Sequence, residues 1–244
     1  MIISSKQNAE IKRIASLKEK KYREEYGEYL VEGVKMVKEA ILSGAEVREI
    51  VGVDNALKEL PPVSVSVKEV SGEVFARLSE TKTPQGVMAV VKKPRNEALP
   101  PRGNCAVLDG ISDPGNLGTI IRTSAALGIK DVYLVNCADA FSPKTVRASM
   151  SGIYYVNLRA FNAETVYRLI SKNNIIVADM DGKNVFGSDV KKPYALVIGN
   201  EANGVSGFFK GVANETVSVP MDGKVESLNA AVAFAVIAYA IENK

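Results

Sequence analysis

The chain has 244 residues, and its 31 lysines and arginines against 28 aspartates and glutamates give a formal net charge of +3. It has no histidine and only two cysteines, which excludes catalytic pairs containing histidine and zinc or haem sites with histidine ligands. Two cysteines do not suggest a disulfide framework, so any catalysis must use other side chains, backbone amides or a bound cofactor.

The sequence predicts a cytoplasmic protein without a membrane-spanning segment. Its first residues lack the long apolar core of a secretory signal. The longest apolar run covers residues 230–241, which is shorter than the roughly 20 residues that a helix needs to cross a bilayer. We therefore interpret this run as a buried helix. The small excess of positive charge does not by itself indicate a nucleic-acid partner.

The N-terminal part has the pattern of a small α/β domain. Ile11, Ile14 and Leu17 recur with helical spacing and predict a first helix. We expect strands at 29–31, 47–53, 63–67 and 87–91, and helices at 34–42 and 74–78. The first helix and the residues after it carry many cations, which most often form a solvated face but also suit phosphate binding. The candidate phosphate-binding cations are Lys12, Arg13, Lys20, Lys21 and Arg23.

The clearest change in composition lies in residues 92–104, which combine prolines, charged residues and a glycine without apolar periodicity. This pattern is typical of a linker. It predicts an N-terminal domain at 1–93, a linker at 94–104 and a C-terminal domain at 105–244, each of the two domains large enough for its own core.

The C-terminal part alternates apolar strands with helices. Strands are predicted at 105–108, 132–135, 154–158, 175–178, 195–198 and 216–219. Helices are predicted at 117–127, 143–150, 164–171 and 227–242. Continuous apolar strands separated by helices are typical of a parallel sheet that is covered on both faces.

Three loops rich in glycine, asparagine and acidic residues follow predicted strands, at 109–118, 199–206 and 220–229. Ligands of parallel sheets bind beyond the carboxyl ends of the strands, where these loops lie. Each loop alone is more simply a turn with a helix cap, but three at successive strand ends favour a binding site. The first loop lacks the G-x-G-x-x-G pattern, and no P-loop is present, so a nicotinamide dehydrogenase and a P-loop protein are both disfavoured.

These loops carry three sequence blocks that closely resemble the SpoU/TrmH family of RNA ribose 2′-O-methyltransferases, which belong to the SPOUT class and use S-adenosylmethionine. The blocks are N-x-G-x-x-x-R at 116–122, I-G-N-E-x-x-G-V-S at 198–206 and V-P-M-x-G-x-x-x-S-L-N-x-x-V-A at 219–233. Residues 3–33 are also similar to the start of two-domain members, whose N-terminal domain resembles small ribosomal-protein-like RNA binders. The resemblance implies a homodimer and a C-terminal parallel-sheet domain tied into a deep trefoil knot.

The resemblance also implies a cofactor cleft formed by the second and third blocks. Glycines there let the backbone approach the cofactor, and apolar side chains would enclose its adenine. Val219 and Leu228 have core packing as an alternative role, and Ser227 has helix capping. The residues assigned to cofactor contact are Ile198, Gly199, Gly204, Val219, Met221, Ser227 and Leu228.

Arg122 is the main catalytic candidate, with Asn116, Glu201 and Asn229 as polar supports. In the family this arginine is implicated in activating the ribose 2′-hydroxyl. A guanidinium keeps its proton up to about pH 12, so it acts either as a base in unusual surroundings or as a cation that binds phosphate and stabilises the developing alkoxide. An ordinary surface arginine is the alternative, and Glu201 could orient Arg122 through a bidentate pair.

The sequence therefore predicts an enzyme that methylates ribose 2′-hydroxyls of structured RNA and needs no metal. Ribosomal RNA is favoured over transfer RNA, because two-domain members more often modify ribosomal RNA. The alternatives are a transfer RNA methyltransferase or a non-catalytic RNA-binding protein that keeps the fold. Lys144 and Arg147 resemble a family segment near the RNA, or they are solvated charges.

Overall fold

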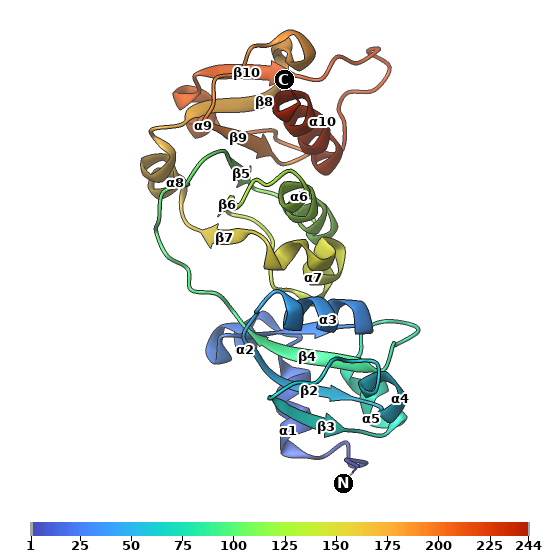
Figure 1. Ribbon diagram of the computed structural model, residues 1–244. Helices are drawn as coiled ribbons and strands as arrows, with labels where there is room; N and C mark the ends of the chain where they lie inside the picture. The colour runs from blue at the N-terminus through green and yellow to red at the C-terminus, as the bar shows by residue number, and fades with distance from the viewer. Residues whose placement is uncertain (1, 244) are drawn as a thin grey trace. The chain divides into compact units, whose positions relative to one another are not determined.

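The computed structural model describes residues 2–243, and the chain forms two compact units (Figure 1). Unit 1 comprises the chain up to Pro94 together with Phe141–Tyr154. Unit 2 comprises Arg95–Ala140 together with the chain from Tyr155 onward. None of the helices in residues 2–243 has the length and apolarity that a membrane crossing requires.

Unit 1 is built on a four-stranded sheet in the order β1-β4-β2-β3. The strands are β1 (Glu28–Glu32), β4 (Val87–Lys92), β2 (Val47–Gly52) and β3 (Ser66–Glu69). β4 pairs antiparallel with both neighbours, and β2 pairs parallel with β3. The helices of this unit are α1 (Ala9–Ser16), α2 (Lys20–Tyr26), α3 (Val34–Leu42), α4 (Asp54–Leu57), α5 (Gly72–Leu78) and α7 (Pro143–Ser149), followed by the 3-10 helix η1 (Met150–Tyr154).

The two faces of this sheet pack against different elements. Helices α1 and α5 share a core with every second strand residue, for example Leu30 and Val90. Tyr29 points to the opposite face, where its ring lies 5.0 Å from that of Phe141, centroid to centroid. The hydroxyl of Tyr154 donates a hydrogen bond of 3.4 Å to the carbonyl oxygen of Met36. The segment that holds α7 and η1 therefore packs in unit 1, although its sequence lies inside the predicted C-terminal domain.

Unit 2 is an α/β unit with a fully parallel six-stranded sheet in the order β10-β8-β9-β5-β6-β7. The strands are β5 (Cys105–Asp109), β6 (Asp131–Val135), β7 (Asn157–Ala160), β8 (Asn174–Asn184), β9 (Tyr194–Gly199) and β10 (Glu215–Ser218). The helices are α6 (Pro114–Ala126), α8 (Ala163–Ile170), α9 (Gly207–Val212) and α10 (Ala230–Glu242), with the 3-10 helix η2 (Val185–Gly187). The predicted parallel-sheet fold class is confirmed.

The central strands of unit 2 are buried on both faces, which explains their continuous apolar runs. Helices α8 and α9 share a core with one face of the sheet through residues such as Val166 and Phe209. Helix α10 packs against α6 and β9, and Figure 1 shows α6 and α10 on the side of the sheet away from α8 and α9. The carboxyl ends of β5 and β9, which are neighbours, carry the loops that contain the first two sequence blocks.

Several element boundaries differ from the predictions. The strand predicted at 154–158 is shifted to β7, at Asn157–Ala160, because η1 runs to Tyr154. The predicted closing helix starts three residues later than expected, at Ala230, because Asn229 accepts hydrogen bonds from two backbone amides of its first turn. Strand β8 continues to Asn184, well beyond its apolar part. The predicted strand at 63–67 is shifted to β3, at Ser66–Glu69, and helices α2, α4 and α9 were not predicted.

A buried ion pair at the start of β6 gives unit 2 a pH-dependent stability. Burial raises the pKa of Asp131, but hydrogen bonds from Arg159, the Arg102 amide and Asn157 outweigh burial and hold this pKa below its ordinary value. The lowered pKa contributes stability that is present above about pH 4 and is lost as the pH falls further.

Replacing Asp131 with asparagine is expected to lower the free energy of unfolding by about 2 kcal/mol at pH 7, because Arg159 loses its buried partner. Urea unfolding monitored by circular dichroism measures this change. At pH 3 the difference between wild type and variant should shrink, since the wild-type carboxylate is then being protonated. An equal difference at both pH values would contradict the assignment.

Candidate functional site

A cavity of about 450 Å³ lies at the carboxyl ends of β8, β9 and β10. Its size falls within the range of about 300–1,000 Å³ that is usual for small-molecule sites. The end of β9, the loop after it, the segment before α10 and the first turns of α10 contribute its walls. All seven residues predicted to contact a cofactor line it, namely Ile198, Gly199, Gly204, Val219, Met221, Ser227 and Leu228.

Gly199 is required by the close approach of two backbone segments. A Cβ atom at this position would lie 2.1 Å from the carbonyl carbon of Gly204 and 2.2 Å from the amide nitrogen of Val205. Gly204 itself has φ +64°, a conformation that favours glycine. The loop is closed by a hydrogen bond of 2.8 Å from the Gly204 amide to the carbonyl oxygen of Asn200. The cavity therefore has a wall of bare backbone that a ligand can approach closely.

Hydrogen bonds hold this loop against the loop that follows β5. The Ser206 amide donates a hydrogen bond of 2.8 Å to Asp109, a buried carboxylate at the end of β5. The side-chain amide of Asn200 donates a bond of 3.0 Å to the carbonyl oxygen of Gly110. The first and second sequence blocks thus meet where β5 and β9 end side by side.

Three of the four predicted catalytic residues form one hydrogen-bonded chain, with one member from each sequence block. The side-chain amide of Asn116 donates to a carboxylate oxygen of Glu201. The side-chain amide of Asn229 donates a bond of 2.9 Å to the side-chain oxygen of Asn116. Glu201 also lines the cavity, so the chain reaches from the cavity wall to the N-terminus of α10.

Arg122 lies apart from this chain. It is exposed on α6 and does not line the cavity. Arg122 comes six residues after Asn116 on α6, so the two side chains point in directions that differ by about 240° around the helix axis. Within residues 2–243 no ion pair joins Arg122 to Glu201, whose carboxylate accepts from Asn116 instead. The bidentate pair between Arg122 and Glu201 is therefore not formed within residues 2–243.

The side chains of Asp113 and Asn229 cap helices α6 and α10. The side chain of Asp113 caps α6 by accepting a hydrogen bond of 2.9 Å from the Asn116 amide. Asn229, rather than Ser227, caps α10. Ser227 is exposed to the cavity, which leaves its hydroxyl available to a ligand.

The contribution of β8 to the cavity was not predicted from the sequence. The second half of this strand brings Asp179, Met180 and Asp181 to the wall, and α9 brings Lys210. The Lys210 ammonium lies 2.5 Å from the Asp179 carboxylate and holds the pKa of Asp179 below its ordinary value. A sequence signal for this contribution was available: Asp179 and Asp181 follow the predicted apolar strand at 175–178, whose end lies at the same sheet edge as the other loops.

Two cations of the candidate RNA-binding face are structural. Arg23 is 3 % exposed, and its guanidinium donates hydrogen bonds of 2.8 and 2.6 Å to the carbonyl oxygens of Leu17 and Lys18. Arg13 pairs with two carboxylates of the sheet, Glu28 and Glu49. The buried Arg23 is therefore not available to RNA, whereas RNA binding by Arg13, whose side chain is 32% exposed, stays a prediction. The exposed members of the set are Lys12, Lys20 and Lys21.

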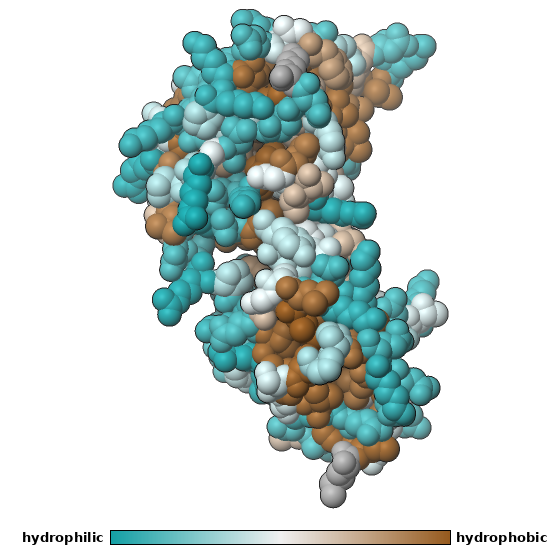
Figure 2. Space-filling view, viewed as in Figure 1, coloured by the Kyte–Doolittle hydropathy of each residue, from teal (hydrophilic) through white to brown (hydrophobic). Residues whose placement is uncertain are grey.

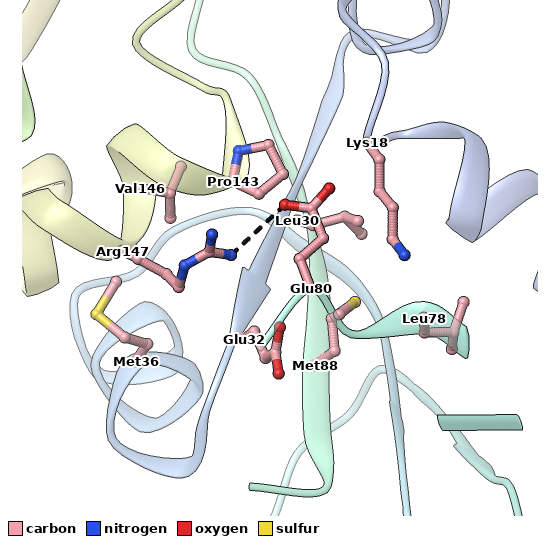
Figure 3. Close-up of a pocket in the computed structure, with 10 residues that line it drawn as sticks. All are labelled: Lys18, Leu30, Glu32, Met36, Leu78, Glu80, Met88, Pro143, Val146 and Arg147. Carbon is pink, nitrogen blue, oxygen red and sulfur yellow. Dashed lines mark ion pairs between the residues drawn. The ribbon is translucent and has the colours of Figure 1, made fainter. Parts of the chain in front are cut away.

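The other predicted RNA contacts, Lys144 and Arg147, lie on α7 in unit 1. Arg147 borders a small hollow with Glu80, and their charged groups are 3.7 Å apart (Figure 3). The free space in this hollow is about 10 Å³, enough for one water molecule at most. Lys144, which follows the hollow's Pro143 in the sequence, is exposed. Neither residue belongs to the cavity in unit 2.

The parallel sheet, the cavity beyond its strand ends and the three blocks around it define a methyltransferase of the SPOUT class. The SpoU rRNA Methylase family matches residues 104–239, and an MRM3-like substrate binding domain matches residues 8–89. The chain belongs to the SpoU rRNA methylase family, which confirms the resemblance. In residues 2–243 no group of three or more histidine, cysteine, aspartate or glutamate side chains is arranged to hold a metal ion.

The chain is similar over its whole length to individual members of this family. It is 32% identical to the 23S rRNA (guanosine(2553)-2'-O)-methyltransferase RlmP of Bacillus subtilis, with 97% of each chain covered. The AdoMet-bound rRNA methyltransferase of Sinorhizobium meliloti matches with a TM-score of 0.90 and 28% identity, over 100% of this chain and 97% of that one. The SpoU methyltransferase AviRb of Streptomyces viridochromogenes, in complex with AdoMet, matches with a TM-score of 0.89 and 28% identity, over 97% and 98%.

Proposed function

We propose that this protein transfers a methyl group from S-adenosylmethionine to a ribose 2′-hydroxyl of ribosomal RNA. The observation that carries the proposal is one cavity lined by all seven cofactor candidates, with Glu201 linking it to Asn116 and Asn229. Two relatives with AdoMet-bound structures support the choice of cofactor. A relative named as a 23S rRNA methyltransferase supports the choice of substrate.

The residues of the cavity fit S-adenosylmethionine. Gly199 lets the backbone at Gly204 and Val205 pack against it, and Ile198, Val219 and Leu228 would supply apolar contacts to the adenine ring. Backbone groups of the two loops would bind the edge of the adenine. When bound, the cofactor supplies an activated methyl group, so the protein mainly has to orient the 2′-hydroxyl and exclude water.

Asn116, Glu201 and Asn229 then act as positioning residues. Their hydrogen-bonded chain fixes the three loops relative to one another, which keeps the cavity and the substrate oxygen in a defined geometry. Arg122 is exposed on α6, and its guanidinium offers hydrogen-bond donors but no acceptor. We therefore assign it the role of a cation that binds the RNA phosphate and stabilises the developing alkoxide, rather than that of a base.

We further propose that the protein acts as a homodimer in the cytoplasm, with the knotted topology of its class. The outer face of α10 carries apolar side chains, and Figure 2 shows hydrophobic surface over this helix. Val232 and Tyr239 are 49 % and 48 % exposed there and lie about two turns apart on the same side of the helix. A second copy on this face would cover them and, since α10 packs against α6, would lie close to Arg122.

Transfer of tritiated methyl groups from S-adenosylmethionine to unmodified 23S rRNA transcripts tests the proposal. A 2′-O-methyl group protects the adjacent phosphodiester bond from alkali, so hydrolysis of the product locates the methylated nucleotide. We expect incorporation into ribosomal RNA and none into a transcript pool of transfer RNA. Incorporation into transfer RNA alone would overturn the substrate assignment. Binding of RNA without methylation of either would favour a non-catalytic RNA-binding protein.

A further inference from the structure

Carboxylates outnumber cations among the side chains that line the cavity. Four carboxylates line it, those of Asp179, Asp181, Glu201 and Glu226, against the single cation Lys210. A lining with this charge repels a polyanionic RNA and attracts a positively charged ligand.

Two of the four carboxylates are already engaged. Asp179 forms an ion pair with Lys210, and Glu201 accepts a hydrogen bond from Asn116. In the described chain, residues 2–243, the carboxylates of Asp181 and Glu226 have no hydrogen-bond or ion-pair partner. They come from different elements, the second half of β8 and the segment before α10, and both are exposed residues that line the cavity.

The proposed reaction changes the charge of the cofactor. The bond between the sulfonium and the methyl carbon breaks with its electron pair left on sulfur, the carbon–oxygen bond forms, and the hydroxyl proton passes to water. The sulfonium of S-adenosylmethionine thus becomes the neutral thioether of S-adenosylhomocysteine. The two molecules differ by one methyl group and one positive charge, and a cavity of this size cannot separate them by volume alone.

We infer that Asp181 and Glu226 are specificity-determining residues that make the cavity prefer the cationic cofactor over its neutral product. The inference rests on the proposed function. Opposite charges several ångströms apart across water attract weakly, so we expect each carboxylate to change the affinity for the cationic cofactor about threefold. Because the attraction disappears with the sulfonium charge, the same residues favour release of the product after each turnover.

Isothermal titration calorimetry with three ligands tests the inference on the full chain. The ligands are S-adenosylmethionine, its neutral product S-adenosylhomocysteine, and sinefungin, which carries an ammonium group in place of the sulfonium. In Asp181→Asn and in Glu226→Gln, binding of both cationic ligands should weaken about threefold, and in the double variant about tenfold. Binding of S-adenosylhomocysteine should stay within 1.5-fold, roughly the precision of the method, which also reports that the cavity is intact.

Asp189→Asn is the matched control, since Asp189 is exposed in the same unit, does not line the cavity and undergoes the same change of charge. It should leave all three affinities unchanged. Equal weakening of all three ligands in the cavity variants, unchanged affinity for the cationic ligands, or the same effect in the control would each overturn the inference. Failure of the wild-type chain to bind S-adenosylmethionine would overturn the proposed function instead.

Discussion

Replacing Arg122 with alanine is expected to lower the rate of methyl transfer to ribosomal RNA by about 10³-fold, while the affinity for S-adenosylmethionine stays unchanged. The guanidinium is exposed and lies outside the cavity, so its removal leaves the cofactor contacts intact. Its proposed contribution appears only when negative charge develops on the ribose oxygen. Single-turnover kinetics with tritiated cofactor measure the rate, and calorimetry measures the affinity.

Two further variants separate the role of Arg122 from a general loss of positive charge. Arg168→Ala removes an exposed arginine from α8 in the same unit and should keep the wild-type rate. Arg122→Lys keeps the charge but loses the planar fork of donors, and it should recover only part of the rate. Full activity of Arg122→Ala would refute the assignment, and a parallel loss of cofactor affinity would show that the residue supports the cavity instead.

The sequence was sufficient to predict the parallel-sheet fold and to place the seven cofactor candidates around one cavity. Apolar strands alternating with helices determine the sheet, and the rule that ligands bind beyond the strand ends places the loops of the three blocks together. The meeting of Asn116, Glu201 and Asn229 follows from this geometry, since each lies in a different one of these loops. These predictions rest on regularities of the backbone that do not depend on details of packing.

Predictions that depend on a particular tertiary contact were the ones that failed. Arg23 lies in a run of charged residues, and no pattern there distinguishes it from its exposed neighbour Lys21; only the carbonyl groups folded around it make it a buried residue. The acidic end of β8 was missed because the apolar pattern stops at Ala178, whereas the pairing with β10 continues to Asn184. Helix α7 itself was predicted at 143–150, but its packing in unit 1 has no signal in its local sequence.

The expected effect of Gly199→Ala is a loss of at least about 100-fold in affinity for S-adenosylmethionine, together with a decrease of about 2–3 kcal/mol in the free energy of unfolding. The added methyl carbon would overlap the backbone at Gly204 and Val205, at 2.1 and 2.2 Å, and backbone cannot move aside as a flexible side chain can. The loop after β9 must therefore shift by roughly 1 Å, which displaces a wall of the cavity and strains the bonds that tie the loop to β5.

Gly207→Ala is the matched control for this prediction, because it adds the same methyl group eight residues further on, at the start of α9. A Cβ there meets no atom within 4 Å, and alanine suits a helix better than glycine does. Its affinity and stability should equal or slightly exceed those of the wild type. Calorimetry and thermal unfolding of the two variants measure both quantities. Because the steric overlap is between backbone atoms, a Gly199→Ala variant that binds the cofactor normally would mean that the loop does not pack on the end of β9 in solution.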